Sequence, residues 1–245
     1  MQTINITSRQ NPLVKEWVGL RKQKDADTFI VEGAHLVEMA AMNKSLLAYI
    51  SVSAHSPYND LVHYIIHPTV AEKLSELKTS PGIFGLCQKN SRGLDYTKPI
   101  VYLDDLRDPG NLGTIMRSSL AFGFDNIVSS PESVAFFNPK VLSGGQGAHF
   151  ALNLEVLPFY ALYNEVKARG YQIIVTTLDD AQTINAIPKS EKIVLVIGNE
   201  ARGVDPNILK LADQRLRLKM SAKIESLNAG VAASIIMHHH FIIKA

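Results

Sequence analysis

From residue 100 onward, short apolar runs alternate with segments of helical periodicity, and this alternation limits the fold more than any other feature of the chain. Residues 193–197 form a continuous apolar run, as expected of a strand covered on both faces. Parallel strands need a crossover, which is usually a helix, so the alternation predicts an α/β domain with a parallel sheet. Expected strands lie within residues 100–105, 126–130, 172–178 and 192–200, and expected helices within 114–124 and 159–171.

The first part of the chain is organised differently. Residues 1–98 contain shorter mixed elements, among them a helix that should begin near Asn11 and Pro12. The polar, turn-rich segment 91–99 is the best linker candidate. We therefore predict two domains, residues 1–92 and residues 99–245.

Composition excludes several classes of protein. The 245 residues are 46% hydrophobic and 20% charged, which predicts a packed core and argues against global disorder. Cys87 is the only cysteine, so an intrachain disulfide and zinc sites built from paired cysteines are both excluded. We expect Cys87 to be a small core residue. Cysteine usage and the lack of a signal-peptide pattern fit a cytoplasmic protein.

Neither a membrane nor a metal ion is an expected partner of this chain. No apolar stretch approaches the roughly 20 residues that a membrane-spanning helix needs. The consecutive residues His238, His239 and His240 would point in different directions on a helix and cannot jointly hold one metal ion. We therefore predict neither a membrane partner nor a bound metal.

The charge pattern leaves nucleic-acid binding open. A net charge of +2 neither indicates nor excludes it, because a local patch would suffice. Near the N-terminus there is a local excess of four positive charges, which suits a solvated helix face as well as it suits RNA. The residues concerned are Arg9, Lys15, Glu16, Arg21, Lys22 and Lys24.

Small and amide-bearing residues gather in three loops of the second domain. These loops are Asp108–Gly113, Ile197–Gly203 and Ser226–Gly230. Ligands bind at the carboxyl ends of strands in open α/β sheets, so together the loops form a candidate site. Each loop taken alone fits an ordinary turn better than a binding site. The glycine spacing of a dinucleotide-binding fold is missing, which disfavours a nicotinamide-dependent oxidoreductase.

Taken together and in this order, the three loops resemble the signature motifs of the SpoU/TrmH family of SPOUT methyltransferases. The first resembles DPxNxGxxxR, the second GxExxG and the third SLNxxxA. Residues near the N-terminus resemble the small, ribosomal-protein-like, substrate-binding α/β domain that precedes the catalytic domain in many members. The upstream positions are Ser8, Asn11, Lys15, Phe29, Glu32 and Gly33.

The resemblance implies S-adenosylmethionine-dependent methylation of an RNA ribose 2′-hydroxyl. It also implies a homodimer formed through the C-terminal domain, and a trefoil knot over about residues 193–240. Chains rarely form knots. By the match of motifs, the cofactor would be held by Thr177, Gly198, Asn199, Gly203, Leu218, Met220, Ser226 and Leu227.

The same match implies a catalytic group of Asn111, Arg117, Glu200 and Asn228. Methyl transfer needs the hydroxyl to be aligned with the methyl group and to lose its proton. By family resemblance Arg117 would be the catalytic arginine, acting on the proton or binding the substrate phosphate. Glu200 is expected to accept hydrogen bonds rather than to act as the base. The two asparagines could equally close their loops.

The N-terminal domain favours ribosomal RNA as the substrate. The alternatives are transfer RNA, or a non-catalytic RNA-binding or assembly protein on the same fold. The chain departs from its relatives at two places. The loop 138–144 lacks their arginine near Ser143 and offers only Lys140, and Lys219 stands where they usually have proline.

Overall fold

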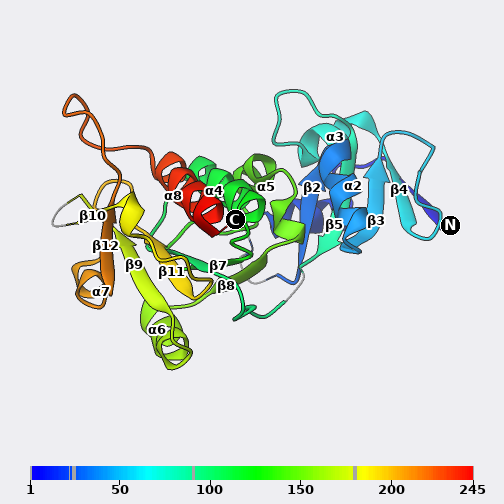
Figure 1. Cartoon of the computed structure of the whole chain (residues 1–245). Helices are drawn as coiled ribbons and strands as arrows, with labels where there is room; N and C mark the ends of the chain where they lie inside the picture. The colour runs from blue at the N-terminus through cyan, green and yellow to red at the C-terminus, as the bar shows by residue number, and fades with distance from the viewer. Residues whose placement is uncertain (1, 22, 24–25, 90–91, 179–180, 245) are drawn as a thin grey trace. The chain divides into compact units, whose positions relative to one another are not determined.

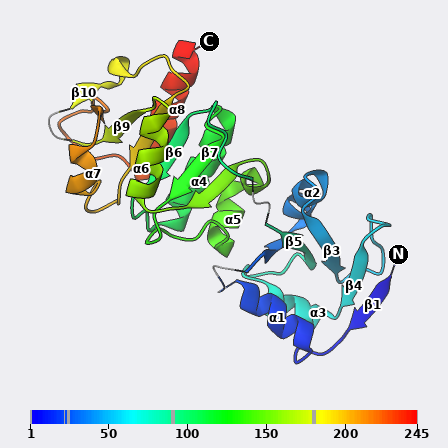
Figure 2. The same ribbon diagram turned by 90° about the horizontal axis from the view of Figure 1, so that it is seen from below.

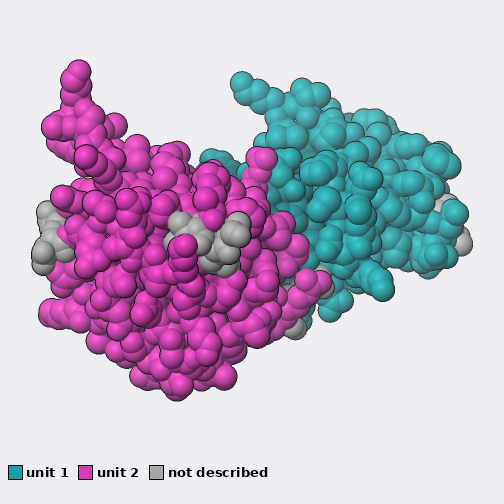
Figure 3. Space-filling model, viewed as in Figure 1, with its two compact units in different colours: residues 1–90, 137–150 teal, residues 91–136, 151–245 magenta. Residues whose placement is uncertain are grey.

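The computed structural model describes residues 2–21, 23, 26–89, 92–178 and 181–244. The chain forms two compact units (Figure 3). Unit 1 comprises residues 1–90 and 137–150, and unit 2 comprises residues 91–136 and 151–245. Lys22 and Lys24 of the N-terminal basic group lie outside the described residues.

Unit 1 is built on a five-stranded mixed sheet with the strand order β1-β4-β3-β5-β2 (Figures 1 and 2). Strand β4 is parallel to β1 and β3, and β5 is antiparallel to β3 and β2. Its elements are β1 (Thr3–Ile6), α1 (Pro12–Leu20), β2 (Thr28–Glu32), α2 (Ala34–Met42), β3 (Leu46–Ser51), β4 (Val62–Ile66), α3 (Pro68–Leu74), β5 (Ile83–Gln88), α5 (Pro139–Gly145) and the 3-10 turn η1 (Ala148–Phe150).

Successive side chains of β2 enter two different cores, because neighbours along a strand face opposite sides of a sheet. Ile30 packs with residues of α1 and α3, including Trp17. Phe29 packs on the other face with α2 and with Phe150. Cys87 belongs to this second core and is fully buried, which confirms its expected role as a core residue. Burial raises the pKa of the Cys87 thiol.

Residues 137–150 pack with unit 1 although they follow the first strands of unit 2 in sequence. The ring centroid of Phe29 lies 4.6 Å from that of Phe137 and 6.0 Å from that of Phe150. The segment 138–144, expected as a loop, contains helix α5. Asn138 caps this helix by accepting from the Lys140 N–H at 2.9 Å, and Pro139 occupies its first turn.

Unit 2 contains a seven-stranded sheet with the strand order β10-β12-β9-β11-β6-β7-β8. Every pair of neighbouring strands is parallel, which confirms the predicted parallel α/β sheet. Its elements are β6 (Ile100–Leu103), α4 (Pro109–Ala121), β7 (Asn126–Ser129), β8 (Asn153–Val156), α6 (Phe159–Ala168), β9 (Gln172–Thr176), β10 (Gln182–Thr183), η2 (Ile184–Ala186), β11 (Ile193–Ile197), α7 (Pro206–Lys210), β12 (Gln214–Arg217) and α8 (Ala229–Lys244).

Helices cover both faces of this sheet, so its central strands are buried on both sides. Val194 and Val196 of β11 pack with side chains of α6 and α7. Helices α4 and α8 lie side by side on the opposite face (Figure 1). All five residues of β11 are buried, as its continuous apolar run predicts.

The sequence placed some elements wrongly or missed them. Helix α4 begins at Pro109 rather than near Thr114, because the Asp108 side chain caps it by accepting from the Asn111 N–H at 2.7 Å. Short strands β8 and β12 were not predicted. Among the described residues, no helix has the length and apolar character needed to cross a bilayer.

Candidate functional site

The first two motif loops leave the sheet side by side. Strands β6 and β11 are parallel neighbours, and Leu103 pairs with Ile197 at their carboxyl ends. The Asp104 N–H donates to the Ile197 carbonyl at 2.8 Å, so pairing continues one residue beyond β6. Consequently the loops that follow these two strands start from the same edge of the sheet.

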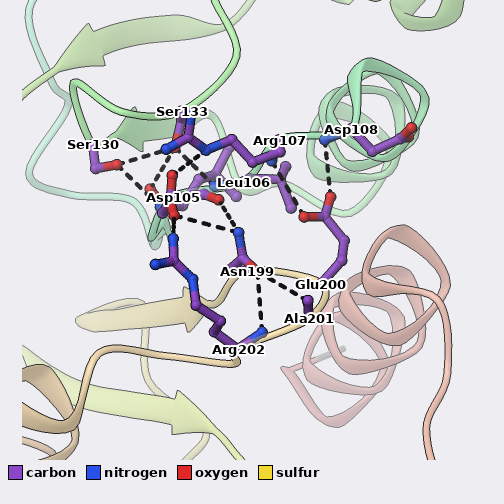
Figure 4. Close-up of polar contacts among 11 residues, drawn as sticks. Asp105, Leu106, Arg107, Asp108, Ser130, Ser133, Asn199, Glu200, Ala201 and Arg202 are labelled. Carbon is purple, nitrogen blue, oxygen red and sulfur yellow. Dashed lines mark hydrogen bonds and ion pairs between the residues drawn. The ribbon is translucent and has the colours of Figure 1, made fainter.

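The carboxylate of Glu200 joins the second loop to the start of α4 (Figure 4). Its Oε1 accepts from the Asp108 N–H at 3.0 Å and from Asn111 Nδ2 at 2.9 Å. Its Oε2 accepts from the Arg107 N–H at 3.3 Å. Glu200 therefore satisfies backbone donors that precede or open α4, where the helix dipole also favours a negative charge.

These contacts also determine the protonation of Glu200. Partial burial alone would raise the pKa of its carboxyl. The hydrogen bonds from Asn111 and from the backbone of Asp108 and Arg107 outweigh that effect, so the pKa of Glu200 lies below its ordinary value. At neutral pH Glu200 is ionised and engaged as an acceptor, which agrees with its expected orienting role.

Asp105 is a second connection between the two loops, and sequence reasoning missed it. Its carboxylate pairs with Arg107 of its own loop and with Arg202 of the second loop (Figure 4). Its backbone carbonyl accepts from Asn199 Nδ2 at 2.8 Å. Its backbone adopts a φ of 53°, a conformation that aspartate tolerates better than most residues.

Two buried serines accept hydrogen bonds from the backbone of this loop. The Asp105 N–H donates to Ser130 Oγ at 3.0 Å, and the Leu106 N–H donates to Ser133 Oγ at 3.0 Å. The two hydroxyls are themselves 3.1 Å apart. An aspartate after one strand and serines after the next are the sequence signals that could have indicated this network.

The second loop is a tight turn that only glycine permits at its start. The Asn199 N–H donates to the Gly203 carbonyl at 3.0 Å, and the Gly203 N–H donates back at 2.9 Å. A Cβ on Gly198 would lie 2.4 Å from Gly203 C and 2.4 Å from Val204 N. The Asn199 side chain accepts from the N–H groups of Ala201 and Arg202, which fixes the turn from inside.

The third motif opens α8 and packs against α4. Asn228 Oδ1 accepts from the Val231 N–H at 3.1 Å, so Asn228 caps α8. Asn111, in contrast, lies in the first turn of α4 and not in a turn of its own. Along the two helices, Ser118 Oγ lies 2.6 Å from Ser234 Oγ.

Arg117 is exposed on α4. It lies one helical turn after Thr114. Thr114 packs closely against Gly230 of α8, because a Cβ added to Gly230 would lie 3.1 Å from the Thr114 Cβ. In the part of the chain that the structure describes, no side chain pairs with Arg117. Among these residues Arg117 forms no surface ion pair, so its guanidinium is available for an anion.

A family comparison identifies the protein class. The model of the SpoU rRNA Methylase family matches residues 98–238. The chain belongs to this family. It is accordingly an RNA 2′-O-methyltransferase that uses S-adenosylmethionine. The family, enzyme class and cofactor that the three motifs implied are confirmed.

Individual relatives extend the match beyond the family model. The chain is 33% identical to 23S rRNA (guanosine(2553)-2′-O)-methyltransferase RlmP of Bacillus subtilis, over 96% of this chain and 98% of that protein. The AdoMet-bound rRNA methyltransferase of Sinorhizobium meliloti has a TM-score of 0.86 at 24% identity, covering 98% of both chains. A TrmH/SpoU tRNA modifying enzyme of A. aeolicus has a TM-score of 0.52 at 27% identity, covering 60% of this chain and 75% of that one.

The remaining residues expected to bind the cofactor lie just after β9 and between β12 and α8. The Thr177 N–H donates to the Leu216 carbonyl at 3.0 Å, just past the end of β9. Leu218, Met220 and Leu227 are half-buried, and Ser226 is exposed, in the segment between β12 and α8. Their assignment to the cofactor stays a prediction. In the described ranges no group of three or more histidine, cysteine, aspartate or glutamate side chains could hold a metal ion.

Substitution of Gly198 should disrupt the second loop. Gly198→Ala places a Cβ against the backbone of Gly203 and Val204, so the turn must open and S-adenosylmethionine binding should fall by at least tenfold in a calorimetric titration. Gly93→Ala is the control, because an added Cβ there meets nothing within 4 Å. Unchanged affinity in the Gly198 variant would remove this loop from the cofactor site.

The connection made by Glu200 should be lost in acid. A lowered pKa means that the ionised form stabilises the folded protein above the unfolded value of about 4.3. That contribution should decline as the pH falls through the lower folded pKa. We expect urea unfolding of the wild type and Glu200→Gln to differ at pH 7, and to converge as the pH falls below the lowered pKa of Glu200 in the folded protein. A difference that stays constant with pH would contradict the assignment.

Proposed function

We propose that the protein methylates a ribose 2′-hydroxyl in ribosomal RNA, at a site where the three motifs meet and Arg117 receives the substrate. The observation that carries this proposal is the Glu200 connection, because it joins the second loop to the start of α4. Arg117 lies on the same helix and is unpaired among the described side chains. A rigid site with one available guanidinium suits a reaction that depends on alignment of the hydroxyl.

The backbone around the second loop fits S-adenosylmethionine. The missing side chain of Gly198 lets the backbone of Gly203 and Val204 lie against the end of β11, since a Cβ there would be 2.4 Å from both. The backbone groups of this tight turn are therefore fixed in place to bind a ligand. The half-buried side chains of Leu218, Met220 and Leu227 would contact the apolar parts of the cofactor. We assign Thr177, Asn199, Gly203 and Ser226 to the same site. When bound, the cofactor supplies the electrophilic methyl group.

The polar residues divide into orienting groups and one substrate group. Glu200 is ionised and accepts three N–H donors, so it holds the site together and does not take the proton. Asn111 is held by Glu200, and Asn228 caps α8. Arg117 binds the phosphate beside the target ribose, and its charge favours loss of the hydroxyl proton. An arginine keeps its own proton near neutral pH, so positioning is the better-supported role.

Ribosomal RNA is favoured over transfer RNA by the extent of the matches. The rRNA methyltransferase of B. subtilis matches over 96% of this chain, including unit 1, whereas the tRNA modifying enzyme of A. aeolicus matches over 60%. Unit 1 would then serve as the substrate-binding domain. The predicted domains 1–92 and 99–245 follow the two units except at residues 137–150, which belong to unit 1. We place the protein in the cytoplasm, and we infer a trefoil knot over about residues 193–240.

The target nucleotide can be identified directly. We would map 2′-O-methylation across the RNA of a deletion strain and of its parent. One ribosomal position methylated only in the parent is the expected result. A lost mark in transfer RNA would overturn the choice of substrate, and identical maps would overturn the activity in the cell.

We also propose a homodimer formed through unit 2. Helix α8 exposes Val231, Ile235 and Ile242, which share one helix face. Helix α4, which packs beside α8, exposes Leu120. These side chains are 38–55% exposed, which is unusual for a row of large apolar residues.

Arg117 should be required for methyl transfer but not for cofactor binding. Arg117→Ala removes the group assigned to the phosphate beside the target ribose, so the rate should fall by at least 100-fold while S-adenosylmethionine affinity changes less than twofold. Arg117→Lys keeps the charge but loses the two-point contact and should be intermediate. Tritium transfer and calorimetry measure the two effects. Full activity of Arg117→Ala would refute the role.

A charge on the exposed face of α8 should separate the dimer. Ile235→Glu should sediment as a monomer in analytical ultracentrifugation, because a carboxylate would be buried without a partner. Met42→Glu is a matched control, since Met42 is a 72% exposed apolar residue of unit 1. A dimeric Ile235 variant would contradict an interface on this face.

A further inference from the structure

Strand β12 and the residues after it carry exposed cations at alternate positions. Leu216 is 1% exposed, and Leu218 and Met220 are half-buried. Arg217 and Lys219, which lie between them, are exposed. This period of two is that of an extended chain with one inward and one outward face. The pattern continues beyond Arg217, where β12 ends.

The positive charge of this segment is not neutralised by nearby carboxylates. The charged groups of Arg217, Lys219 and Lys223 form no hydrogen bond or ion pair with any residue that the structure describes. Asp213, at the start of β12, is already engaged by Lys167 Nζ at 2.8 Å. From residue 217 to 225 the sequence has three cations and one carboxylate, Glu225. We call Arg217, Lys219 and Lys223 the basic stripe.

The basic stripe begins at the edge of the sheet that carries the motif loops. Strand β12 is parallel to β9, and β9 is parallel to β11, so their carboxyl ends share that edge. Beyond β12 the chain extends away from the body of unit 2 before it returns to α8 (Figures 1 and 3). The stripe is thus accessible and adjoins the residues assigned to the cofactor.

We infer that the basic stripe binds the phosphate backbone of the RNA substrate. This inference rests on the proposed function and adds an RNA-binding surface to it. Exposed cations spaced along an extended chain suit successive phosphates of a strand, and each contact releases counterions. Inward side chains of the same segment would meanwhile contact the cofactor, so one segment would serve both substrates.

Lys219 is the central cation of the basic stripe, between Arg217 and Lys223. Its long, flexible side chain carries three donors and can reach a phosphate.

The test measures RNA affinity and its salt dependence in the full chain. The probe is an unmodified transcript of 23S ribosomal RNA, and the variant is Arg217→Ala/Lys219→Ala/Lys223→Ala. Loss of three phosphate contacts should lower the slope of log affinity against log salt by about 2, and weaken binding roughly tenfold to a hundredfold at 100 mM salt. Binding of S-adenosylmethionine and the melting temperature should stay unchanged, because the removed side chains are exposed.

Two further variants make the outcome specific. Lys210→Ala is the control, because it removes one positive charge at the end of α7, where the chain enters β12 at the opposite edge of the sheet. This variant should keep the wild-type slope. A triple variant that carries Lys219→Arg instead of Lys219→Ala, with the other two changes kept, should recover about one third of the lost slope. Wild-type RNA affinity in the triple variant overturns the inference, as does a parallel loss of S-adenosylmethionine binding.

Failure of the inference can be distinguished from failure of the proposed function. If the wild type binds and methylates the transcript and the triple variant does so equally well, only the stripe is wrong. If the wild type neither binds nor methylates any ribosomal transcript, the substrate assignment itself is wrong. Binding of the wild type to phosphatidylserine vesicles but not to the transcript would identify a different anionic partner and overturn the inference.

Discussion

The candidate site depends on one carboxylate that serves two loops. Glu200 comes from the loop after β11, yet its hydrogen bonds go to the loop after β6 and to the first turn of α4. This works because β6 and β11 are adjacent and in register at their carboxyl ends. A charge that accepts backbone donors at a helix start costs little to hold and orients the whole helix. The position of Arg117, two turns further along α4, follows from it.

Asp105 adds a second connection that restricts the same loops from the opposite side. It draws Arg107 and Arg202 together, while its backbone is fixed by Asn199 and Ser130. Exposed ion pairs contribute little to the free energy of folding. Their consequence is geometric, because they limit the freedom of loops that would otherwise have only solvent around them. The carboxyl edge of the sheet and the carboxylates of Glu200 and Asp105 together form a surface that can align two substrates.

Much of this could be predicted from local sequence, and the rest could not for identifiable reasons. The apolar run of β11 and the alternation around it indicated a parallel sheet, because burial on both faces demands such a run. Helix α5 was missed although Asn138-Pro139 is a good helix start, since the helix is only seven residues long and its periodicity is weak. Strand β12 was missed because its alternation is apolar and cationic, which resembles a surface loop.

The sequence by itself determined the chemistry: three motifs with particular residue types, and the family to which they belong. Only the tertiary structure decided which of those residues meet. Glu200 and Asn111 are 89 positions apart in the chain, and Asp105 and Arg202 are 97 apart, so no local pattern encodes their contact. The packing of residues 137–150 with unit 1 is likewise a long-range choice, made where Phe29 can bury two aromatic rings. Local propensity fixes the elements, whereas burial and pairing between distant segments fix the site.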